Sequence, residues 1–392
     1  MQSLAEELKP EAWTVSSNSA LKISLVDKNG AAQFNPTFTY PIFGDSEQIF
    51  GYKDLEIHLA FDSVTFKPFV NVKYTKKLND EVIDVQEKLL EFLPREDVIV
   101  KDEAKWIETF EIEQKDFNLS DVSSLLAAFS HEGHPFEVRK MKLDSEAAKR
   151  FHRRIQIFTL LFIESASYID ENDSNWEFYF TVNASTKQII AFSTAYRFWK
   201  YLSAATFDAH EQYQFSSKVS QFLVFPPYQK NEHGTNLYNA IFDYWLGDES
   251  VVEINVEEPN EGFDLLRDKC DLRRVLCSEL PNRIPHDLPL PEDWISATRS
   301  DLKLEKRQFM RLIEMLLLKN NSPNFRLQVK KRIWDRNFDV LMELDKSTRN
   351  DKIQTAFESV RDEYAAILST VTKRNHDEVD FDENKSKKTK SN

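Results

Sequence analysis

The sequence contains little glycine, and this shortage excludes several classes of enzyme. Its seven glycines in 392 residues never lie closer than seven positions apart. A P-loop needs two glycines five positions apart, a dinucleotide-binding loop needs spacings of two and three, and the nucleophile elbow of serine hydrolases needs a spacing of four. This sequence therefore cannot contain any of these three motifs.

Cysteine is scarcer still, and no long apolar segment is present. Cys270 and Cys277 are too few for a zinc site of their own or for a secreted disulfide framework, which indicates a reducing compartment. The first ten residues lack the apolar core of a signal peptide, and the longest apolar run, 155–163, is about half of the ~20 residues that cross a membrane. The sequence therefore predicts a soluble protein of the cytoplasm and nucleus with no membrane partner.

Neither nucleic acid nor a metal ion fits the remaining composition. Lysine and arginine number 51 against 65 aspartates and glutamates, which gives a net charge of −14. Such a chain does not favour phosphate backbones, whereas acidic residues around a cleft would suit a basic partner. His131 and His134 lie three positions apart with Gly133 between them, whereas a zinc-binding helix pair needs a spacing of four. We expect no direct nucleic-acid binding and no metal.

The first predicted region is a mixed N-terminal domain that covers residues 1–145. Apolar and polar residues alternate at 55–61 and 70–74, which predicts two neighbouring strands. An apolar stripe predicts a helix over 80–93, and the segment 131–135 is predicted to be a loop.

Residues 146–280 form the second predicted domain. Ser145 is the predicted N-cap of one long helix over 145–168. The predicted elements after it are a hairpin of 176–182 and 187–196, a strand over 219–225, a helix over 235–246, a strand over 251–256 and a helix from Glu261. This alternation predicts an α/β or α+β packing around a central sheet.

The remainder of the chain is predicted to be helical and then disordered. Residues 281–372 form a helical C-terminal domain after a proline-rich connector. Residues 373–392 form a charged tail whose lysines would serve either nuclear import or solubility.

The stretch 220–234 carries the first functional pattern. It consists of a strand, a turn stiffened by Pro226 and Pro227, a polar loop and a helix start near Thr235. Consecutive backbone N–H groups in such a turn, together with the positive end of a helix, form a nest for phosphate oxygens. An ordinary strand-to-helix connection would have the same pattern.

Three glutamates are candidate proton acceptors. Glu257 and Glu258 follow a predicted strand directly, and Pro259 then turns the chain out of the sheet. Partial burial and mutual repulsion would raise their pKa and allow one of them to take a proton from a lysine ammonium. Glu164 follows the apolar run 155–163, so we expect partial burial there as well. The alternatives are a solvated acidic turn for the pair and a helix that reaches solvent at Glu164.

Several ordered blocks of the sequence fit one known family. They are SQFLVFPPYQ at 220–229 with His233-Gly234, VEEPN at 256–260, FGDSE at 43–47 with FGYK at 50–53, FIESASYID at 162–170 and YRFWKY at 196–201. These blocks resemble the catalytic subunit of type B histone acetyltransferases. The resemblance covers residues 40 to about 275, and the C-terminal helical region is similar to the fungal branch of that family.

The resemblance implies a fold, a reaction and partners. The fold would be α+β, with a GNAT-type mixed sheet flanked by helices, a mixed N-terminal domain and a helical C-terminal domain. The protein would transfer acetyl from acetyl-CoA to lysines in the N-terminal tail of newly synthesised, free histone 4. Histone 3 and a WD-repeat histone-binding subunit would accompany the substrate during chromatin assembly. Transfer would be direct, so Cys270 and Cys277 are expected to be packing residues.

The resemblance also implies roles for individual residues. Glu257 would be the general base, with Glu164 and Glu258 as assisting carboxylates. The backbone of residues 222–224 would pair with the pantetheine arm, and the turn 229–235 would hold the pyrophosphate. The full acetyl-CoA site would comprise Phe222, Leu223, Val224, Gln229, Lys230, Asn231, Glu232, His233, Gly234, Thr235, Asn260 and Phe263. The histone tail would contact Asp45, Ser46, Glu47, Trp176, Trp199, Lys200 and Tyr201.

One position departs from the pattern of the superfamily. The turn usually reads Gln/Arg-x-x-Gly-x-Gly/Ala, and Glu232 stands at the first glycine position. The loop would tolerate this side chain at a negative φ, but its carboxylate would weaken acetyl-CoA binding by repulsion of the pyrophosphate. Two alternatives to the histone 4 enzyme stay open. Glu232 would mark a catalytically weak histone-binding escort, and the chemistry would also suit an acetyltransferase for another basic protein.

Overall fold

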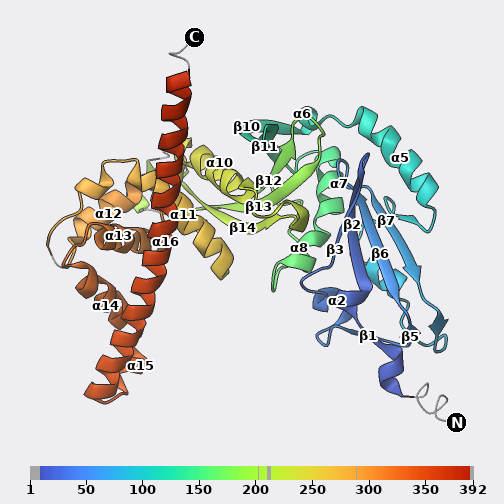
Figure 1. The fold of residues 1–392 in the computed structure, drawn as a ribbon, viewed down its shortest axis with the longest axis horizontal. Helices are drawn as coiled ribbons and strands as arrows, with labels where there is room; N and C mark the ends of the chain where they lie inside the picture. Colours follow the sequence, from blue (N-terminus) through green and yellow to red (C-terminus); the bar gives the residue numbers. More distant parts are fainter. Residues whose placement is uncertain (1–8, 202, 210–212, 288, 389–392) are drawn as a thin grey trace. The chain divides into compact units, whose positions relative to one another are not determined.

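The computed structural model describes residues 9–201, 203–209, 213–287 and 289–388 (Figure 1). The chain divides into two compact units. The first unit contains residues up to 199 together with 217–244, and the second contains 200–216 and everything from 245 onward. The predicted domain boundaries at 145, 280 and 372 stay predictions.

The first unit contains a five-stranded sheet near its N-terminus. Its strand order is β3-β2-β6-β7-β9, with β2 and β6 parallel and β6 and β7 antiparallel. The strands are β2 (Leu21–Asp27), β3 (Gly30–Phe34), β6 (Glu56–Asp62), β7 (Pro68–Lys73) and β9 (Ile99–Val100). Leu59 and Val70 are fully buried and face each other across β6 and β7, so the two alternating strands predicted there are confirmed.

Short elements surround this sheet. Two small antiparallel ladders pair β1 (Thr14–Ser16) with β4 (Gln48–Phe50) and β5 (Tyr52–Lys53) with β8 (Lys76–Lys77). The helices are α2 (Ser17–Ala20), α3 (Tyr40–Phe43), α4 (Val85–Leu90), α5 (Glu103–Asp116) and α6 (Leu119–Val122), with a 3₁₀ turn at Pro10–Trp13. The helix predicted over 80–93 is shorter than expected, because Asp84 caps α4 by accepting N–H groups of the first turn.

The second sheet of the first unit follows chain order from β10 to β14. Its strands are β10 (Ser123–His131), β11 (His134–Lys142), β12 (Trp176–Asn183), β13 (Ile189–Trp199) and β14 (Phe215–Val224). The hairpin of β12 and β13 and the strand before Phe225 are confirmed. The loop predicted at 131–135 is instead a two-residue hairpin turn, in which Glu132 and Gly133 take φ values of 49° and 82°.

Two short helices lie between the sheets of the first unit (Figure 1). These are α7 (Glu146–Ile155) and α8 (Ile157–Phe162), which replace the single helix predicted over 145–168. Ser145 caps α7 as predicted, accepting the N–H of Ala148 at 3.2 Å. The ring of Phe158 lies 4.8 Å from Phe61 on one side and 4.8 Å from Phe225 on the other, measured between centroids. These aromatic contacts therefore fix the end of β14, which Phe225 directly follows.

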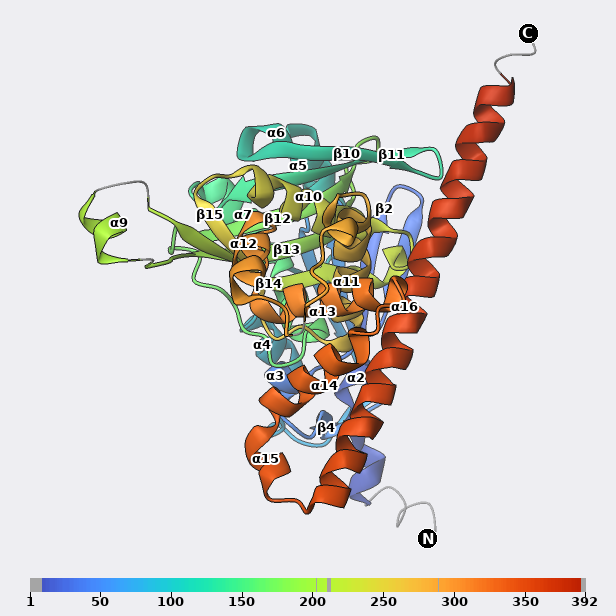
Figure 2. The same cartoon turned by 90° about the vertical axis from the view of Figure 1, so that its left-hand side faces the viewer.

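The second unit is mainly helical, as predicted for the C-terminal region (Figure 2). It contains α9 (Ala204–Asp208), the strand β15 (Val251–Val256), α11 (Glu261–Leu276), a 3₁₀ turn at Leu280–Asn282, α12 (Glu292–Asp301), α13 (Lys306–Lys319), α14 (Phe325–Arg336), α15 (Phe338–Met342) and α16 (Lys346–Lys388). The helix α10 (His233–Gly247) contributes its last three residues to this unit. Helices α11, α13 and α14 all pack against α16.

A buried ionic cluster fixes α16 to its neighbours in the second unit. Arg332 holds the buried carboxylate of Glu314 with two hydrogen bonds of 2.8 Å, and the hydroxyl of Tyr364 donates to the same carboxylate at 2.9 Å. The tail predicted to be disordered, 373–392, continues α16 as a helix to Lys388, and 389–392 lie outside the described residues.

Candidate functional site

The strand β14 and the turn after it form the first part of the site. Val219, Leu223 and Phe225 are buried, whereas Phe222 and Val224 are half-buried, as an alternating strand requires. The N–H of Phe225 donates to the carbonyl of Ile190 on β13 at 3.1 Å. A 3₁₀ turn at Pro226–Tyr228 then lifts the chain away from the sheet.

The four residues after this 3₁₀ turn are exposed and partly left-handed. Gln229 donates its side-chain amide to the carbonyl of Val224 at 3.0 Å, which closes the turn onto the strand. Lys230 and Glu232 take φ values of 65° and 60°. The condition under which the loop would tolerate a side chain at Glu232, a negative φ, is therefore not met, and the backbone adopts the conformation that glycine prefers. Left-handed residues alternating with right-handed or extended ones build a concave row of N–H groups, which is the geometry of an anion nest.

His233 anchors the turn to the β10–β11 hairpin. Its imidazole is buried, its Nδ1 has no hydrogen-bond partner among the described residues, and its ring centroid lies 4.6 Å from Phe136 and 5.7 Å from His131. Burial, with a smaller contribution from His131, lowers the pKa of His233 to about 4, so it is neutral at pH 7. The resemblance assigned His233 to the cofactor site, but this packing role was not predicted, because the hairpin itself was missed. Gly234 is buried behind it and Thr235 is half-buried in the first turn of α10.

A second part of the site is the segment that carries Glu164. The chain leaves α8 at Phe162 and turns at Ser165, whose φ is 57°. Glu164 is exposed, so the partial burial expected for it is wrong. Gln221 of β14 links this segment to the sheet, because its side chain contacts Thr159 at 3.2 Å and donates to the carbonyl of Ser167 at 2.8 Å.

Tyr40 joins the Glu164 segment to the acidic block 45–47. Its hydroxyl accepts the N–H of Ser165 at 2.6 Å, and its own backbone N–H donates to the carboxylate of Glu47 at 3.2 Å. The N–H of Thr39 donates to Glu47 at 2.6 Å, and this hydrogen bond is the main cause of the lowered pKa of Glu47. The carboxylate of Glu47 is therefore already hydrogen-bonded to backbone N–H groups of the protein.

The other residues predicted to hold a peptide in the first unit are accessible. Asp45 and Ser46 are exposed in the turn that precedes Glu47. Trp176 stacks edge-on against Tyr196 at 4.9 Å and is half-buried, while Trp199 at the end of β13 is 47% exposed.

The second unit contains the remaining candidates around β15. β14 begins in this unit, where the N–H of Phe215 donates to the carbonyl of Ser250 at 2.8 Å. Lys200 forms an ion pair of 2.8 Å with Glu253 of β15. Burial alone would raise the pKa of Glu253, but Lys200 and Asn255 bring it below its ordinary value. Lys200 and Tyr201 lie beyond the end of β13 at Trp199.

Glu257 and Glu258 follow β15, as predicted. Both are exposed, which corrects the partial burial expected for them, and Glu258 has a φ of 37°. Asn260 caps α11 by accepting the N–H of Phe263 at 2.9 Å, so these two residues are fixed relative to each other. Lys303 supports β15 from its side, because its carbonyl accepts the N–H of Ile254 at 2.6 Å.

The structure thus gathers two groups of predicted residues, one in each unit. In the first unit, hydrogen bonds join the acidic block, the Glu164 segment and β14 with its turn. In the second unit, Lys200 pairs with Glu253 of β15, and Glu257, Glu258 and Asn260 follow the end of that strand. Cys270 is buried and Cys277 is exposed, so the packing role expected for Cys277 is wrong.

Two kinds of feature are missing from the described part of the chain. Within it, no three histidine, cysteine, aspartate or glutamate side chains gather as a metal site would require. None of its helices combines the length and the apolar character that crossing a membrane demands.

Comparison with known proteins identifies the family. The chain is 55% identical over 373 residues to the histone acetyltransferase type B catalytic subunit of Kluyveromyces lactis, and the match covers 95% of this chain and 96% of that one. The chain belongs to the family of type B histone acetyltransferase catalytic subunits. The subunit of the same description from Eremothecium gossypii is 51% identical over 371 residues, which is 95% of each chain.

Two family models of this type B family match separate parts of the chain. Residues 13–164 match the model described as the N-terminus of the histone acetyl transferase HAT1, and residues 268–322 match the one described as fungal HAT1, C-terminal. Among solved structures, an aminoglycoside acetyltransferase from a soil metagenomic sample is 15% identical with a TM-score of 0.26, and the match covers 36% of this chain and 88% of that one. The curated relatives show that the chain is an enzyme of the type B family, and its own sheets and helices give it an α+β fold.

Proposed function

We propose that the protein transfers acetyl from acetyl-CoA to a lysine in the N-terminal tail of free histone 4. The observation that carries this proposal is the turn between β14 and α10, which is exposed, alternates left-handed residues and leads into a helix of fifteen residues. Membership of the type B family and the net charge of −14 support it, since an acidic enzyme suits a lysine-rich substrate.

The residues around this turn fit acetyl-CoA. The nest at 229–232 and the N-terminus of α10 would hold the pyrophosphate through backbone N–H groups. The backbone of Phe222, Leu223 and Val224 would pair with the pantetheine arm as an added strand. Asn260 and Phe263 would line the acetyl-CoA site, as the family resemblance implies. We propose that this cofactor-binding core has the GNAT fold.

Glu257 would act as the general base. A lysine ammonium must lose a proton before its nitrogen attacks, and a glutamate placed directly after a strand is a fixed acceptor for that proton. The amine nitrogen then forms a bond to the thioester carbonyl carbon, the carbon–sulfur bond breaks, and coenzyme A leaves as the thiol after taking up a proton. Glu164 and Glu258 would assist, and neither cysteine would carry the acetyl group.

The substrate would lie against exposed acidic and aromatic side chains. Asp45 and Ser46 are free to meet a basic tail, whereas Glu47 would act through the turn that it holds. Trp176, Trp199, Lys200 and Tyr201 would line the rest of the path. We further propose that histone 3 and a WD-repeat histone-binding subunit join the complex, and that the protein works in cytoplasm and nucleus during chromatin assembly.

Transfer from labelled acetyl-CoA to a histone 4 tail peptide tests the proposal. We expect Glu257→Gln to reduce kcat by about 10²-fold or more at pH 7.5. Glu164→Gln and Glu258→Gln should reduce it less, and Glu279→Gln, an exposed glutamate after α11, should leave it unchanged.

Three other results would redirect the proposal. Full activity in Glu257→Gln would move the base to Glu164 or Glu258. Peptide binding without transfer by the unaltered protein would favour the catalytically weak histone-binding escort. The left-handed backbone at Glu232 is the observation that favours this alternative. Faster transfer to an unrelated basic protein than to the histone 4 peptide would favour an acetyltransferase for another basic protein.

A further inference from the structure

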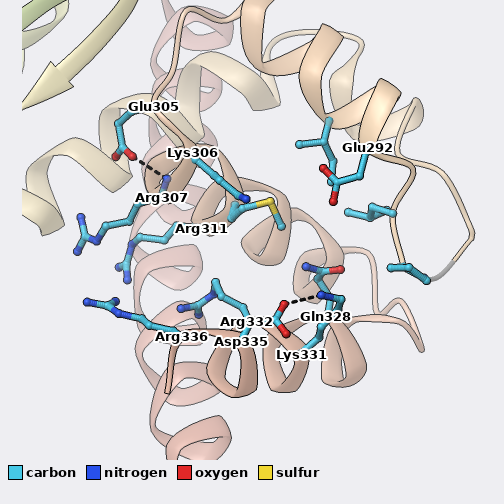
Figure 3. Close-up of a pocket in the computed structure, with 14 residues that line it drawn as sticks. Glu292, Glu305, Lys306, Arg307, Arg311, Gln328, Lys331, Arg332, Asp335 and Arg336 are labelled. Carbon is cyan, nitrogen blue, oxygen red and sulfur yellow. Dashed lines mark hydrogen bonds and ion pairs between the residues drawn. The ribbon is translucent and has the colours of Figure 1, made fainter. Parts of the chain in front are cut away.

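A cavity of about 620 Å³ lies within the helical second unit, between α12, α13 and α14 (Figure 3). Its volume falls in the range of roughly 300–1,000 Å³ that is usual for small-molecule sites. All of its lining residues lie between 289 and 336, far in sequence from the residues assigned to acetyl transfer. The proposed function leaves this cavity unused.

Four arginines gather on one side of the cavity, as Figure 3 shows. Arg307 and Arg311 are one helical turn apart on α13, and Arg332 and Arg336 are one turn apart on α14. Residues at this spacing share a helix face, and like charges so placed destabilise a helix. The arrangement therefore requires compensating anions.

Carboxylates compensate three of the four arginines from outside the cavity. Asp264 pairs with Arg307, with one hydrogen bond of 3.0 Å and one of 2.5 Å. Asp268 and Glu363 pair with Arg311 at 2.5 and 2.6 Å, and Glu314 pairs with Arg332 at 2.8 Å. These ion pairs raise the pKa of all three arginines, so each stays charged.

Two cations of the cavity remain without a carboxylate. Neither Arg336 nor the ammonium of Lys306 has an ion pair or a side-chain hydrogen bond with any described residue. Lys331, in contrast, is paired with Asp335 on the same helix. Glu292 lies on the side of the cavity opposite the arginines (Figure 3).

The paired arginines also present unused donors. Arg311 and Arg332 bind their carboxylates through Nε and Nη2, and the Nη1 group of each has no partner among the described residues. The ring of Tyr364 lies under the guanidinium of Arg311, 5.3 Å from its central carbon. These contacts fix the two guanidinium groups before a ligand arrives, which reduces the entropy lost on binding.

The cavity also has an apolar wall. Pro289, Leu290, Ile295 and Met310 line it, and Leu290 and Met310 are buried. A ligand that fills this cavity would therefore combine an anionic group with an apolar body. An isolated inorganic anion would satisfy only the arginine side.

We propose that this cavity binds a small organic phosphate, a phosphate monoester on an apolar or aromatic body. A phosphate is doubly charged, which suits the arginine side of the cavity, and its three terminal oxygens can accept from donors on two helices at once. A carboxylate has one charge and two oxygens, so it would leave part of this donor set unused. The proposal is independent of the proposed function, because none of these residues was assigned to acetyl transfer.

Calorimetric titration of the full chain with phenyl phosphate tests the proposal. Variants of the cavity, which leave the proposed cofactor site unchanged, distinguish binding in the cavity from binding at that site. We expect phenyl phosphate to bind more tightly than inorganic phosphate, and phenol not to bind. The double variant Lys306→Gln/Arg336→Gln should weaken phenyl phosphate by at least about tenfold, because charge-assisted hydrogen bonds are lost.

Two further variants separate the charged and apolar contributions. Arg326→Gln removes an arginine from the same helix that does not line this cavity, and it should leave the affinity unchanged. Ile295→Gln should weaken phenyl phosphate but not inorganic phosphate. Because the side chains of Lys306 and Arg336 form no ion pair within the described part of the chain, thermal unfolding of the double variant should match that of the unaltered chain.

Specific results would overturn the proposal. Equal affinity of phenyl phosphate for the unaltered chain and the double variant would place binding elsewhere. Failure of phenyl phosphate to bind, with binding of an acidic peptide such as residues 377–383 of this chain, would show that the cavity is a peptide site instead.

Discussion

At Glu232, backbone conformation and side-chain charge act on the same turn. A left-handed residue other than glycine costs about 1 kcal/mol, and the carboxylate stands where pyrophosphate oxygens are proposed to bind. Glu232→Gly should therefore strengthen acetyl-CoA binding by about five- to tenfold in a fluorescence or calorimetric titration.

Glu232→Ala separates the two causes, because it removes the charge but keeps a Cβ at positive φ. We expect an intermediate affinity for it and a lower stability than for Glu232→Gly. Unchanged affinity in both variants would contradict any effect of this residue on the cofactor.

His152 should make the stability of the first unit depend on pH. Burial, with a smaller contribution from Arg153, lowers its pKa from 6.5 to about 4. Above pH 6.5 both the folded and unfolded states are neutral at this residue, so its packing is fully stabilising. As the pH falls from 6.5 towards 4, the unfolded state takes up a proton that the folded state rejects, and up to about 3 kcal/mol of stability is lost.

Urea unfolding at pH 7 and pH 4.5 would measure this loss. His152→Phe keeps an aromatic ring against Phe178 and removes the titration, so it should lose less stability on acidification than the unaltered chain. An identical loss in both proteins would show that other groups control the acid response.

At the scale of elements, Lys303 connects the end of α10 to β15. Its ammonium donates to the carbonyls of Trp245, Leu246 and Asp248 at 3.1, 2.9 and 2.7 Å. The carbonyls of Trp245 and Asp248 also accept the backbone N–H groups of Asp248 and Val251, so Lys303 adds a charged donor to the carbonyl groups at the end of the helix. Its backbone meanwhile forms the bridge to β15, the strand that leads to Glu257.

Lys303→Met should destabilise the second unit by about 2–3 kcal/mol, because three carbonyls lose a charged donor. It should also reduce kcat, since β15 positions the proposed base. Lys306→Met is the matched control, because this exposed lysine forms no ion pair with any residue that the structure describes, and it should change stability by less than about 0.5 kcal/mol. Denaturant unfolding and acetyl transfer would measure both effects, and equal losses in the two variants would refute the capping role.

For the whole molecule, the length of α16 that is needed for folding can be tested by truncation. Its side chains at Phe357, Tyr364, Ile367, Leu368 and Val371 are buried in the second unit. Each contributes about 1.5–3 kcal/mol when buried, and their sum is comparable with the whole stability of a domain.

A chain that ends at residue 372 should therefore keep its melting temperature and activity, whereas one that ends at 345 should lose the cooperative unfolding of the second unit. Differential scanning calorimetry and soluble yield would distinguish them. A stable, active 1–345 chain would show that α16 is dispensable.

The sequence by itself determined the elements whose residue pattern is compatible with only one kind of local structure. Alternation around Leu59 and Val70, the Ser145 cap and the strand before Glu257 were predicted correctly, because burial of one face and capping are local requirements. It also determined the family, since the blocks around Gln221, Glu164 and Glu257 are ordered and specific.

Only the tertiary structure decided how these elements are used. The helix predicted over 145–168 is interrupted near Gln156 and ends at Phe162, and Glu164 beyond it is exposed, because Tyr40 and Gln221 hold the segment 165–167 in a turn. The hairpin at 123–142 was missed because its first strand, 123–131, does not alternate. The occupied carboxylate of Glu47, the buried imidazole of His233 and the arginine-lined cavity all depend on residues distant in sequence. Their burial, charge and free donors exist only where the chain folds those residues together.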